Sequence, residues 1–547
     1  MRRRVRPRGP RRPGRAHHRS RVLPARRDIG RRQGEEHVTS SIRIFIGEPS
    51  SIDPAQGFEH DGALVLRFLA DPLIDFTPDT GEPRPAAAAS WEVDSGGKRV
   101  LFRLRRDVRF HHGRAVTAED YVYSLTRVVR PETGSKLAYN LAMVEGYEAV
   151  LAGRSDTLSG VRALAPDLLE VRLTEPFHEI AAVFGHRVTA PVPAELIEAD
   201  PEDFRVRPVS TGPYRIAEPW REGTGLVLER FDGYYGNNAA YPDGGGGHVD
   251  RIDLAVYDEV DEGYADWQRG ALQITKVPPA QLGDAFRFGE RFRRTPCALM
   301  QYIGFPTRVA PFDDPRVRRA VAMSVDRQHI IDEIFHGTRP IADRVLPPAI
   351  ARGDGGDDLI DIEYSPRRAR ELLAEAGVGT DLEFDFCFNA GLGHDAWVTL
   401  ALDQISAALG WRFRLTPLPW PEFLRWLRRA DSLFRMTWVI DYPSPDNFLY
   451  PLFHSESIHH DNFTGFSSAE FDLLIQRARS TADPAGRAKL YRAAEEVVCS
   501  ALPLLPLWFG VQYHLVDLDR FDIDGPPVDL FGEPALRLYR PRPSSAG

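Results

Sequence analysis

The chain has 547 residues, 43% of them apolar, which is enough for two or three lobes, and it has no run near the roughly 18 apolar residues that a membrane-spanning helix requires. Its net charge of −9 divides into +11 over residues 1–40, where fourteen arginines face three acids, and −20 over the remainder. An acidic body argues against a nucleic-acid receptor, because phosphate binding needs a basic face, and Cys297, Cys387 and Cys499 lack the spacing of a metal site.

Residues 1–40 are rich in arginine, proline and glycine and show no periodic apolar pattern. Such a segment cannot bury enough apolar surface to fold, so we predict a disordered Arg-rich tail. The tail has the charge of an export signal but lacks the apolar stretch of about 7 to 15 residues and the lipid-acceptor cysteine that export would use. It is either an arm for nucleic acid or acidic lipid, or translated upstream sequence before a native start near Val38. Neither interpretation supplies an export signal.

The acidic body opens with a predicted strand at 42–46, in which isoleucine occupies every second position. The turn Ile52-Asp53-Pro54 follows this strand. A helix is then predicted from about Asp61 to Leu73, before the chain reaches its most regular segment.

That segment runs from Arg99 to Val129. Apolar side chains at every second position of 99–104 predict a strand with one buried face. His111-His112-Gly113 breaks the alternation and predicts a structural loop. Thr117, with Asp120 three residues later, forms a capping-box pattern in front of an amphipathic helix. The local pattern therefore predicts strand, turn and helix.

Later blocks repeat this mixture of strands and helices. Gly212-Pro213 marks a turn ahead of a predicted strand at 226–230. Within 311–337, Pro315 opens a predicted helix, because proline is tolerated in the first helical turn. A further helix is predicted within 364–378, starting after Ser-Pro.

The string from Arg99 to Val129 resembles the signature of the family 5 extracytoplasmic solute-binding proteins, the peptide- and nickel-binding receptors of ABC importers. The turn at 52–54 and the blocks at 210–236 and 311–337 resemble other elements of that family, in the same order along the chain. The resemblance covers about residues 41–525.

This resemblance implies an α/β fold of the periplasmic-binding-protein type II class, with two lobes around a cleft, an extra domain and a hinge that the chain crosses twice. The implied division is domain I over 41–60, 190–290 and 506–547, domain II over 61–189, and domain III over 291–505.

A candidate ligand site lies in the segment 435–448, where a strand ends in a proline-rich turn. Asp441 at the strand end is either a turn residue or the partner of a ligand ammonium, which needs a carboxylate once it is desolvated. The resemblance favours the second role and implies that Asp441 holds a peptide's α-amino group, that Trp438 lines the cleft wall, and that Arg435 reaches the C-terminal carboxylate. Trp420 resembles another cleft tryptophan, and the alternative for it is a core position.

The resemblance also implies the function. We expect a protein that binds an oligo- or dipeptide as an added strand, closes over it and delivers it to the permease subunits of an ABC importer. We expect a monomer with an extracytoplasmic location, no nucleic-acid partner and no cofactor.

Two alternatives stay open. His454, His459 and His460 lie close together and could bind a metal, although such clusters in polar loops are usually solvated. Because no export signal is seen, the second alternative is a cytoplasmic ligand-sensing or biosynthetic protein. Such a protein would use the same fold to hold a small amine or peptide. No GxSxG, HExxH or phosphate-loop motif is present, so we do not expect an enzyme.

Overall fold

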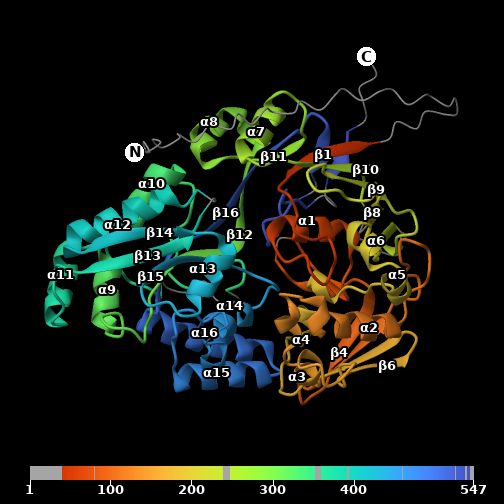
Figure 1. Cartoon of the computed structure of the whole chain (residues 1–547), viewed down its shortest axis with the longest axis horizontal. Helices are drawn as coiled ribbons and strands as arrows, with labels where there is room; N and C mark the ends of the chain where they lie inside the picture. The colour runs from red at the N-terminus through yellow and green to blue at the C-terminus, as the bar shows by residue number, and fades with distance from the viewer. Residues whose placement is uncertain are drawn as a thin grey trace, which may run out of the picture. The chain divides into compact units, whose positions relative to one another are not determined.

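A ten-stranded sheet combines strands that are far apart in the sequence, as the computed structural model shows (Figure 1). The structure describes residues 40–78, 80–237, 247–351, 359–390, 393–458, 460–523, 525–535 and 539–542. The predicted tail lies outside the described residues, except for its last residue, and so does His459. In spatial order the strands are β14 (Arg412–Leu418), β13 (Glu383–Asn389), β15 (Leu433–Val439), β12 (Phe292–Gly304), β16 (Leu504–Val516), β11 (Ile274–Lys276), β1 (Ser41–Ile46), β10 (Arg251–Val256), β9 (Leu226–Arg230) and β8 (Tyr214–Ile216).

Two long antiparallel strands, β12 and β16, join the halves of this sheet. They pair from Phe292 opposite Leu515 to Gly304 opposite Leu504. β16 pairs with β11 near its C-terminal end, whereas β12 pairs with β15 over Leu299–Gly304. These two strands therefore carry the chain from one half of the sheet to the other and back.

The predicted strand at 42–46 is confirmed as β1, and the side chains of Ile42, Ile44 and Ile46 are fully buried. The predicted helix at 61–73 is observed as α1 (His60–Leu69) and ends earlier than expected. Pro72 explains the difference, since a proline disfavours the helical conformation of the residue before it and cannot donate a helical hydrogen bond.

The segment from Arg99 to Val129 folds as predicted. Its strand is β5 (Arg99–Leu104), in a four-stranded sheet of order β4 (Ala88–Val93), β5, β7 (Leu168–Arg172) and β6 (Val161–Ala165). Its helix is α2 (Ala118–Val129), and the Asp120 carboxylate accepts a hydrogen bond of 2.8 Å from the Thr117 backbone N–H. In the loop, His111 is buried and its backbone N–H donates to the Ser210 carbonyl. The loop thus joins two of the sequence blocks.

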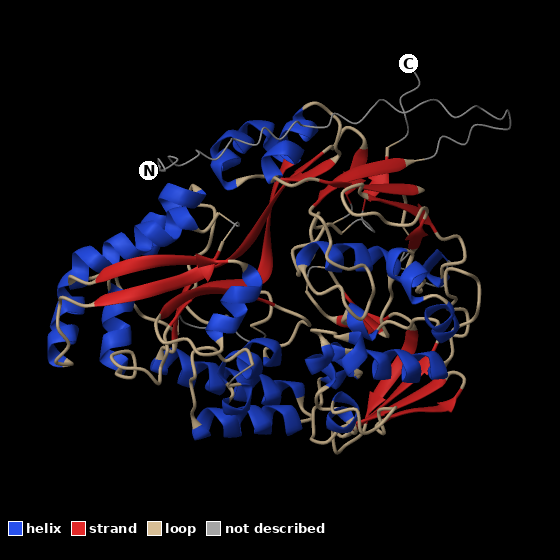
Figure 2. Cartoon of the chain, viewed as in Figure 1, coloured by secondary structure: helices blue, strands red, loops and turns tan. Residues whose placement is uncertain are grey.

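Helices lie beside the ten-stranded and the four-stranded sheet, and the mixture of helix and strand extends along the whole described chain (Figure 2). None of these helices combines the length and the apolar character needed to cross a membrane. The remaining helices are α3 (Tyr147–Leu151), α4 (Ile180–Val183), α5 (Ala194–Ala199), α6 (Pro201–Val206), α7 (Val260–Gln268), α8 (Leu282–Ala285), α9 (Pro315–Met323), α10 (Arg327–Phe335), α11 (Pro366–Glu375), α12 (Asp395–Leu409), α13 (Trp420–Leu427), α14 (Asp446–Phe453), α15 (Ala469–Ser480) and α16 (Pro484–Ala501).

Two-stranded sheets and short turns of 3-10 helix complete the architecture. The sheets pair β2 (Ile74–Phe76) with β3 (Pro83–Pro85), and β17 (Phe521–Ile523) with β18 (Tyr539–Pro541). One 3-10 turn, Ala138–Leu141, matters for the site described below.

Buried apolar side chains form three clusters. One surrounds β1 and α1, a second lies between the four-stranded sheet and α2, and the largest surrounds β12, β15 and β16. We propose that these clusters are the cores of domains I, II and III respectively. Leu64 and Phe68, which the sequence prediction places in domain II, pack in the cluster around β1.

Candidate functional site

Strand β15 leads into the candidate site and has a strand partner along only part of one edge. Over 434–439 it pairs with β12 on one side. On the other side it pairs with β13 at Leu433 and Phe434 alone. Within the described part of the chain, residues 435–439 therefore have an edge without a neighbouring strand.

Asp441 lies two residues beyond the end of β15, and its carboxylate is partly exposed. Its Oδ2 accepts hydrogen bonds from the Tyr139 hydroxyl at 2.9 Å and from the Asn447 side-chain amide at 3.2 Å. The Asp441 backbone N–H donates to Asn447 Oδ1 at 2.8 Å. No described residue donates to Asp441 Oδ1, so the carboxylate is held in place through Oδ2 alone.

A second carboxylate, Asp461, adds negative charge to the same place. Burial and the charge of Asp441 together raise the pKa of Asp461 to about 6, against a smaller opposite effect of Arg428. The sequence analysis missed Asp461, Tyr139 and Asn447. Tyr139 and Asp461 come from other segments, and nothing in their spacing signals this contact.

Arg435 is nearly fully buried, at 6% exposure, and lies on β15 six residues before Asp441. Its guanidinium donates to Asn389 Oδ1 at 2.5 Å, to Gln301 Oε1 at 3.0 Å and to the Thr437 hydroxyl. Desolvation and, to a smaller extent, the charge of Arg339 lower the pKa of Arg435 to about 9, against an opposite effect of Tyr302. Arg435 therefore remains cationic at neutral pH, although amides and a hydroxyl rather than a carboxylate surround it.

The two tryptophans occupy different environments. Trp438 is 9% exposed and belongs to the largest core cluster, and its indole N–H donates to the Asn447 carbonyl at 2.8 Å. Trp420 begins α13, is 37% exposed and contacts the Phe423 ring at 6.1 Å. The structure thus brings Trp438 and Asp441 together through Asn447. The ligand contacts predicted for these four residues stay predictions.

The histidine segment does not assemble a metal site among the described residues, where no group of three or more ligating side chains occurs. His454 stacks on Tyr450 with ring centroids 4.5 Å apart and lies 3.7 Å from Asp472. Burial lowers the pKa of His454.

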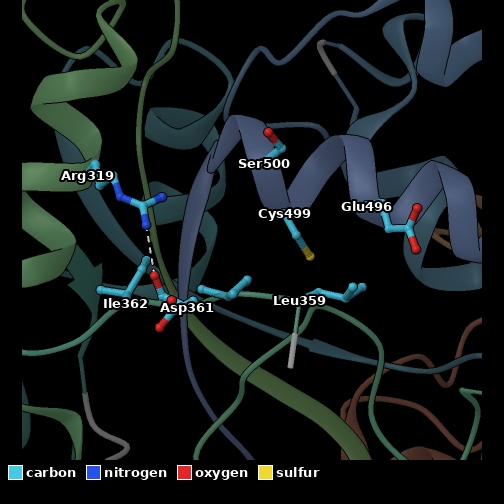
Figure 3. Close-up of a pocket in the computed structure, with 8 residues that line it drawn as sticks. Arg319, Leu359, Asp361, Ile362, Glu496, Cys499 and Ser500 are labelled. Atoms are coloured by element: carbon cyan, nitrogen blue, oxygen red, sulfur yellow. Dashed lines mark hydrogen bonds between the residues drawn. The ribbon is translucent and has the colours of Figure 1, made fainter. Parts of the chain in front are cut away.

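A cavity of about 270 Å³ lies elsewhere, between α9, the segment 359–362 and α16 (Figure 3). The guanidinium of Arg319 reaches across one side of it and donates to the Asp361 carbonyl at 2.8 Å. None of the four candidate residues lines this cavity.

Comparison with known proteins finds one family that matches most of the chain. The model of the bacterial extracellular solute-binding proteins, family 5 Middle, matches residues 82–459. The Dipeptide-binding protein DppE of Bacillus subtilis is 26% identical over 484 residues, which cover 86% of this chain and 86% of DppE. The Probable deoxycholate-binding periplasmic protein YgiS of Escherichia coli is 28% identical over 480 residues, covering 84% of this chain and 86% of YgiS.

Among solved structures, Haemophilus influenzae OppA in complex with RPPGFSPFR superposes with a TM-score of 0.75 at 23% identity. The match covers 92% of this chain and 99% of OppA.

Proposed function

Because this chain belongs to family 5 of the bacterial extracellular solute-binding proteins, we propose that it captures a peptide at the site around Asp441 and delivers it to an ABC importer. The predicted α/β fold of the periplasmic-binding-protein type II class is confirmed by the likeness to OppA. The named ligands of the relatives range from dipeptides to deoxycholate, so the ligand class has to be argued from the site itself.

The Asp441 carboxylate is the observation that carries the proposal. Tyr139 and Asn447 fix its Oδ2, while Oδ1 accepts no hydrogen bond from the described residues. A preorganised carboxylate with a free oxygen suits an ammonium ion, since charge-assisted hydrogen bonds are among the strongest in proteins. The acidic surroundings, which include Asp461, favour a cation further and disfavour an anion such as a bile acid carboxylate.

The open edge of β15 supplies the second feature of a peptide site. Residues 435–439 can pair with an extended peptide, whose main chain would supply hydrogen bonds that do not depend on its sequence. Arg435 lies along this edge and would hold the peptide's C-terminal carboxylate.

The distance between Arg435 and Asp441, which would hold the two termini of the peptide, indicates the ligand's length. Arg435 and Asp441 are six residues apart, which corresponds to about 20 Å at roughly 3.3 Å per strand residue. An extended peptide that meets both ends would contain about five to six residues, at about 3.3 to 3.6 Å per residue. We therefore propose an oligopeptide ligand.

The tryptophans take different roles in this proposal. Trp420 is exposed enough to contact a ligand side chain directly. Trp438 acts through Asn447, because its indole N–H holds the Asn447 carbonyl while the Asn447 side chain holds Asp441.

We propose a binding protein that performs no chemical step and uses no cofactor, and that acts as a monomer with permease subunits as its partners. The description of the family as extracellular supports an extracytoplasmic location. Fractionation of cells that produce the native chain tests this location: recovery of the protein only in the cytoplasm would favour the sensing or biosynthetic alternative.

Isothermal titration of the full chain tests the ligand class. We expect a pentapeptide with free termini to bind at least tenfold more tightly than a dipeptide of the same residue type, because only the pentapeptide reaches both ends. Deoxycholate should not compete. Binding of deoxycholate without binding of any peptide would overturn the proposal.

A further inference from the structure

Two further side chains, Arg339 and His394, lie near Arg435 and come from other segments. Arg339 follows α10, and its guanidinium lies 3.9 Å from the centroid of the Phe335 ring and 5.8 Å from that of Trp508. The Trp508 ring lies 5.2 Å from the ring of Trp397. The Trp397 indole N–H in turn donates to His394 Nδ1 at 3.4 Å. A layer of two tryptophans thus connects Arg339 with His394.

The sheet register places this layer on the same face as Arg435. Gln301 on β12 pairs with Thr437 on β15 and with Trp508 on β16. Directly paired residues of neighbouring strands project from the same face of a sheet. Gln301 Oε1 accepts hydrogen bonds from both Arg435 and Thr437, which confirms this shared orientation.

The three groups also interact electrostatically. Besides burial, which has the largest effect, the positive charges of Arg435 and Arg339 lower the pKa of His394 to about 3, so this imidazole is neutral at pH 7. Its Nδ1 accepts from Trp397, which leaves the proton on Nε2. His394 Nε2 is buried and has no partner among the described residues. It is therefore a hydrogen-bond donor without an acceptor.

Arg435 and Arg339 differ from the arginines of this fold that pair with a carboxylate. Arg479 pairs with Asp446, and Arg344 pairs with Glu495. Among the described residues, by contrast, no carboxylate forms an ion pair with Arg435 or Arg339, and the Nε atom of each is buried without a partner. A charge that is removed from water without an opposite charge nearby is unfavourable, so this arrangement favours a bound anion.

Arg339 and His394 are partly exposed, so the cluster is open to solvent on their side. We propose that Arg339 gives the carboxylate end of the site a second positive charge, which selects peptides whose last residue is Asp or Glu. This inference rests on the proposed function. The two carboxylates of such a residue would meet two guanidinium groups, and His394 Nε2 would donate to one of their oxygens.

The test compares two pentapeptides that differ only in a C-terminal Glu or Gln, titrated into the full chain at low ionic strength. The wild-type protein should bind the Glu peptide at least tenfold more tightly. Arg339→Met keeps the aliphatic stem that packs on Phe335 and should abolish this preference, while its affinity for the Gln peptide stays within about twofold. Arg339→Lys should keep most of the preference. Arg367→Gln, which removes an exposed charge from α11, should keep all of it.

Equal wild-type affinities for the two peptides would overturn the inference, and so would a preference that survives in Arg339→Met. The wild-type comparison needs no variant, so it stands even where Arg339→Met does not fold. If both peptides bind equally but acetylation of their N-terminus weakens binding, this inference fails and the proposed function stands. If neither peptide binds, both fail.

Discussion

Asn447 holds the candidate site together although it touches no ligand in our proposal. Its side chain bonds both the backbone and the carboxylate of Asp441, and its carbonyl accepts from Trp438. The sequence predicts Asp441 and Arg435 as candidates because they stand at fixed positions in a recognisable string. It does not predict Tyr139, which is 302 positions away from Asp441 and reaches it only in the folded chain.

The structure also shows the environment of Trp438, which the sequence alone does not define. A tryptophan on a strand next to a candidate ligand residue suggests an exposed wall, but alternation along a strand does not distinguish a cleft from a core. In the structure the indole is nearly buried, and its one polar atom is used inside the protein.

The raised pKa of Asp461 makes a prediction about stability without ligand. A carboxyl group whose pKa rises from 3.8 to about 6 on folding destabilises the folded state when it is ionised. This loss of folding stability is absent below pH 3.8, grows as the pH rises from 3.8 to about 6, and is complete above pH 6. Asp461→Asn should therefore stabilise the protein at pH 8 by on the order of 1 kcal/mol, and by nothing near pH 4.

Thermal melting of wild type and Asp461→Asn across this pH range measures the effect. Asp403→Asn, an exposed position on α12, is the matched control and should show no pH-dependent difference. A stabilisation by Asp461→Asn that is equal at pH 4 and pH 8 would show that the carboxyl group is not perturbed in the native protein.

Among the elements, those defined by local pattern were predicted best. The strand, loop and helix of 99–129 depend on alternation and on a capping box, both of which are read within a few residues. The order of the ten-stranded sheet depends on pairings such as β1 with β10 and β12 with β16, across about 200 residues. No local pattern encodes these pairings, and only the family resemblance indicates them.

The open edge of β15 is the element that the peptide proposal depends on. Alternate N–H groups of an extended peptide point toward the same neighbouring strand. N-methylation of the peptide amides that face β15 should weaken binding at least tenfold, whereas methylation of the intervening amides should have little effect. A scan of singly methylated pentapeptides measures this alternation. Uniform tolerance of methylation would rule out strand addition.

At the scale of the whole molecule, Glu179 links the core of the four-stranded sheet to the helices that follow β15. It accepts hydrogen bonds from the Ser444 hydroxyl at 2.9 Å and the Tyr491 hydroxyl at 3.0 Å, and it lies 3.5 Å from Arg487. Nearby, the His178 N–H donates to the Arg479 carbonyl. These contacts stabilise the arrangement in which Tyr139 reaches Asp441.

Glu179→Ala should therefore weaken peptide binding several-fold without touching the ligand, because the arrangement that completes the site becomes less populated. Glu179→Gln, which keeps an acceptor oxygen, should have a smaller effect. Titration reports the affinity, and small-angle scattering should show a larger radius of gyration for the Ala variant at partial saturation. An unchanged affinity in Glu179→Ala would remove these contacts from the binding equilibrium.

The central claim is that Asp441 holds the free amino terminus of a peptide. Titration of wild type and Asp441→Asn with one pentapeptide and its N-acetylated form tests it most directly. A hydrogen bond to a charged group contributes about 1.5 to 3 kcal/mol, so the wild-type protein should bind the free peptide at least tenfold more tightly than the acetylated one, and the variant should bind both equally weakly. Equal binding of the two peptides by the wild-type protein, or a preference for the free amine that survives in Asp441→Asn, would contradict the claim.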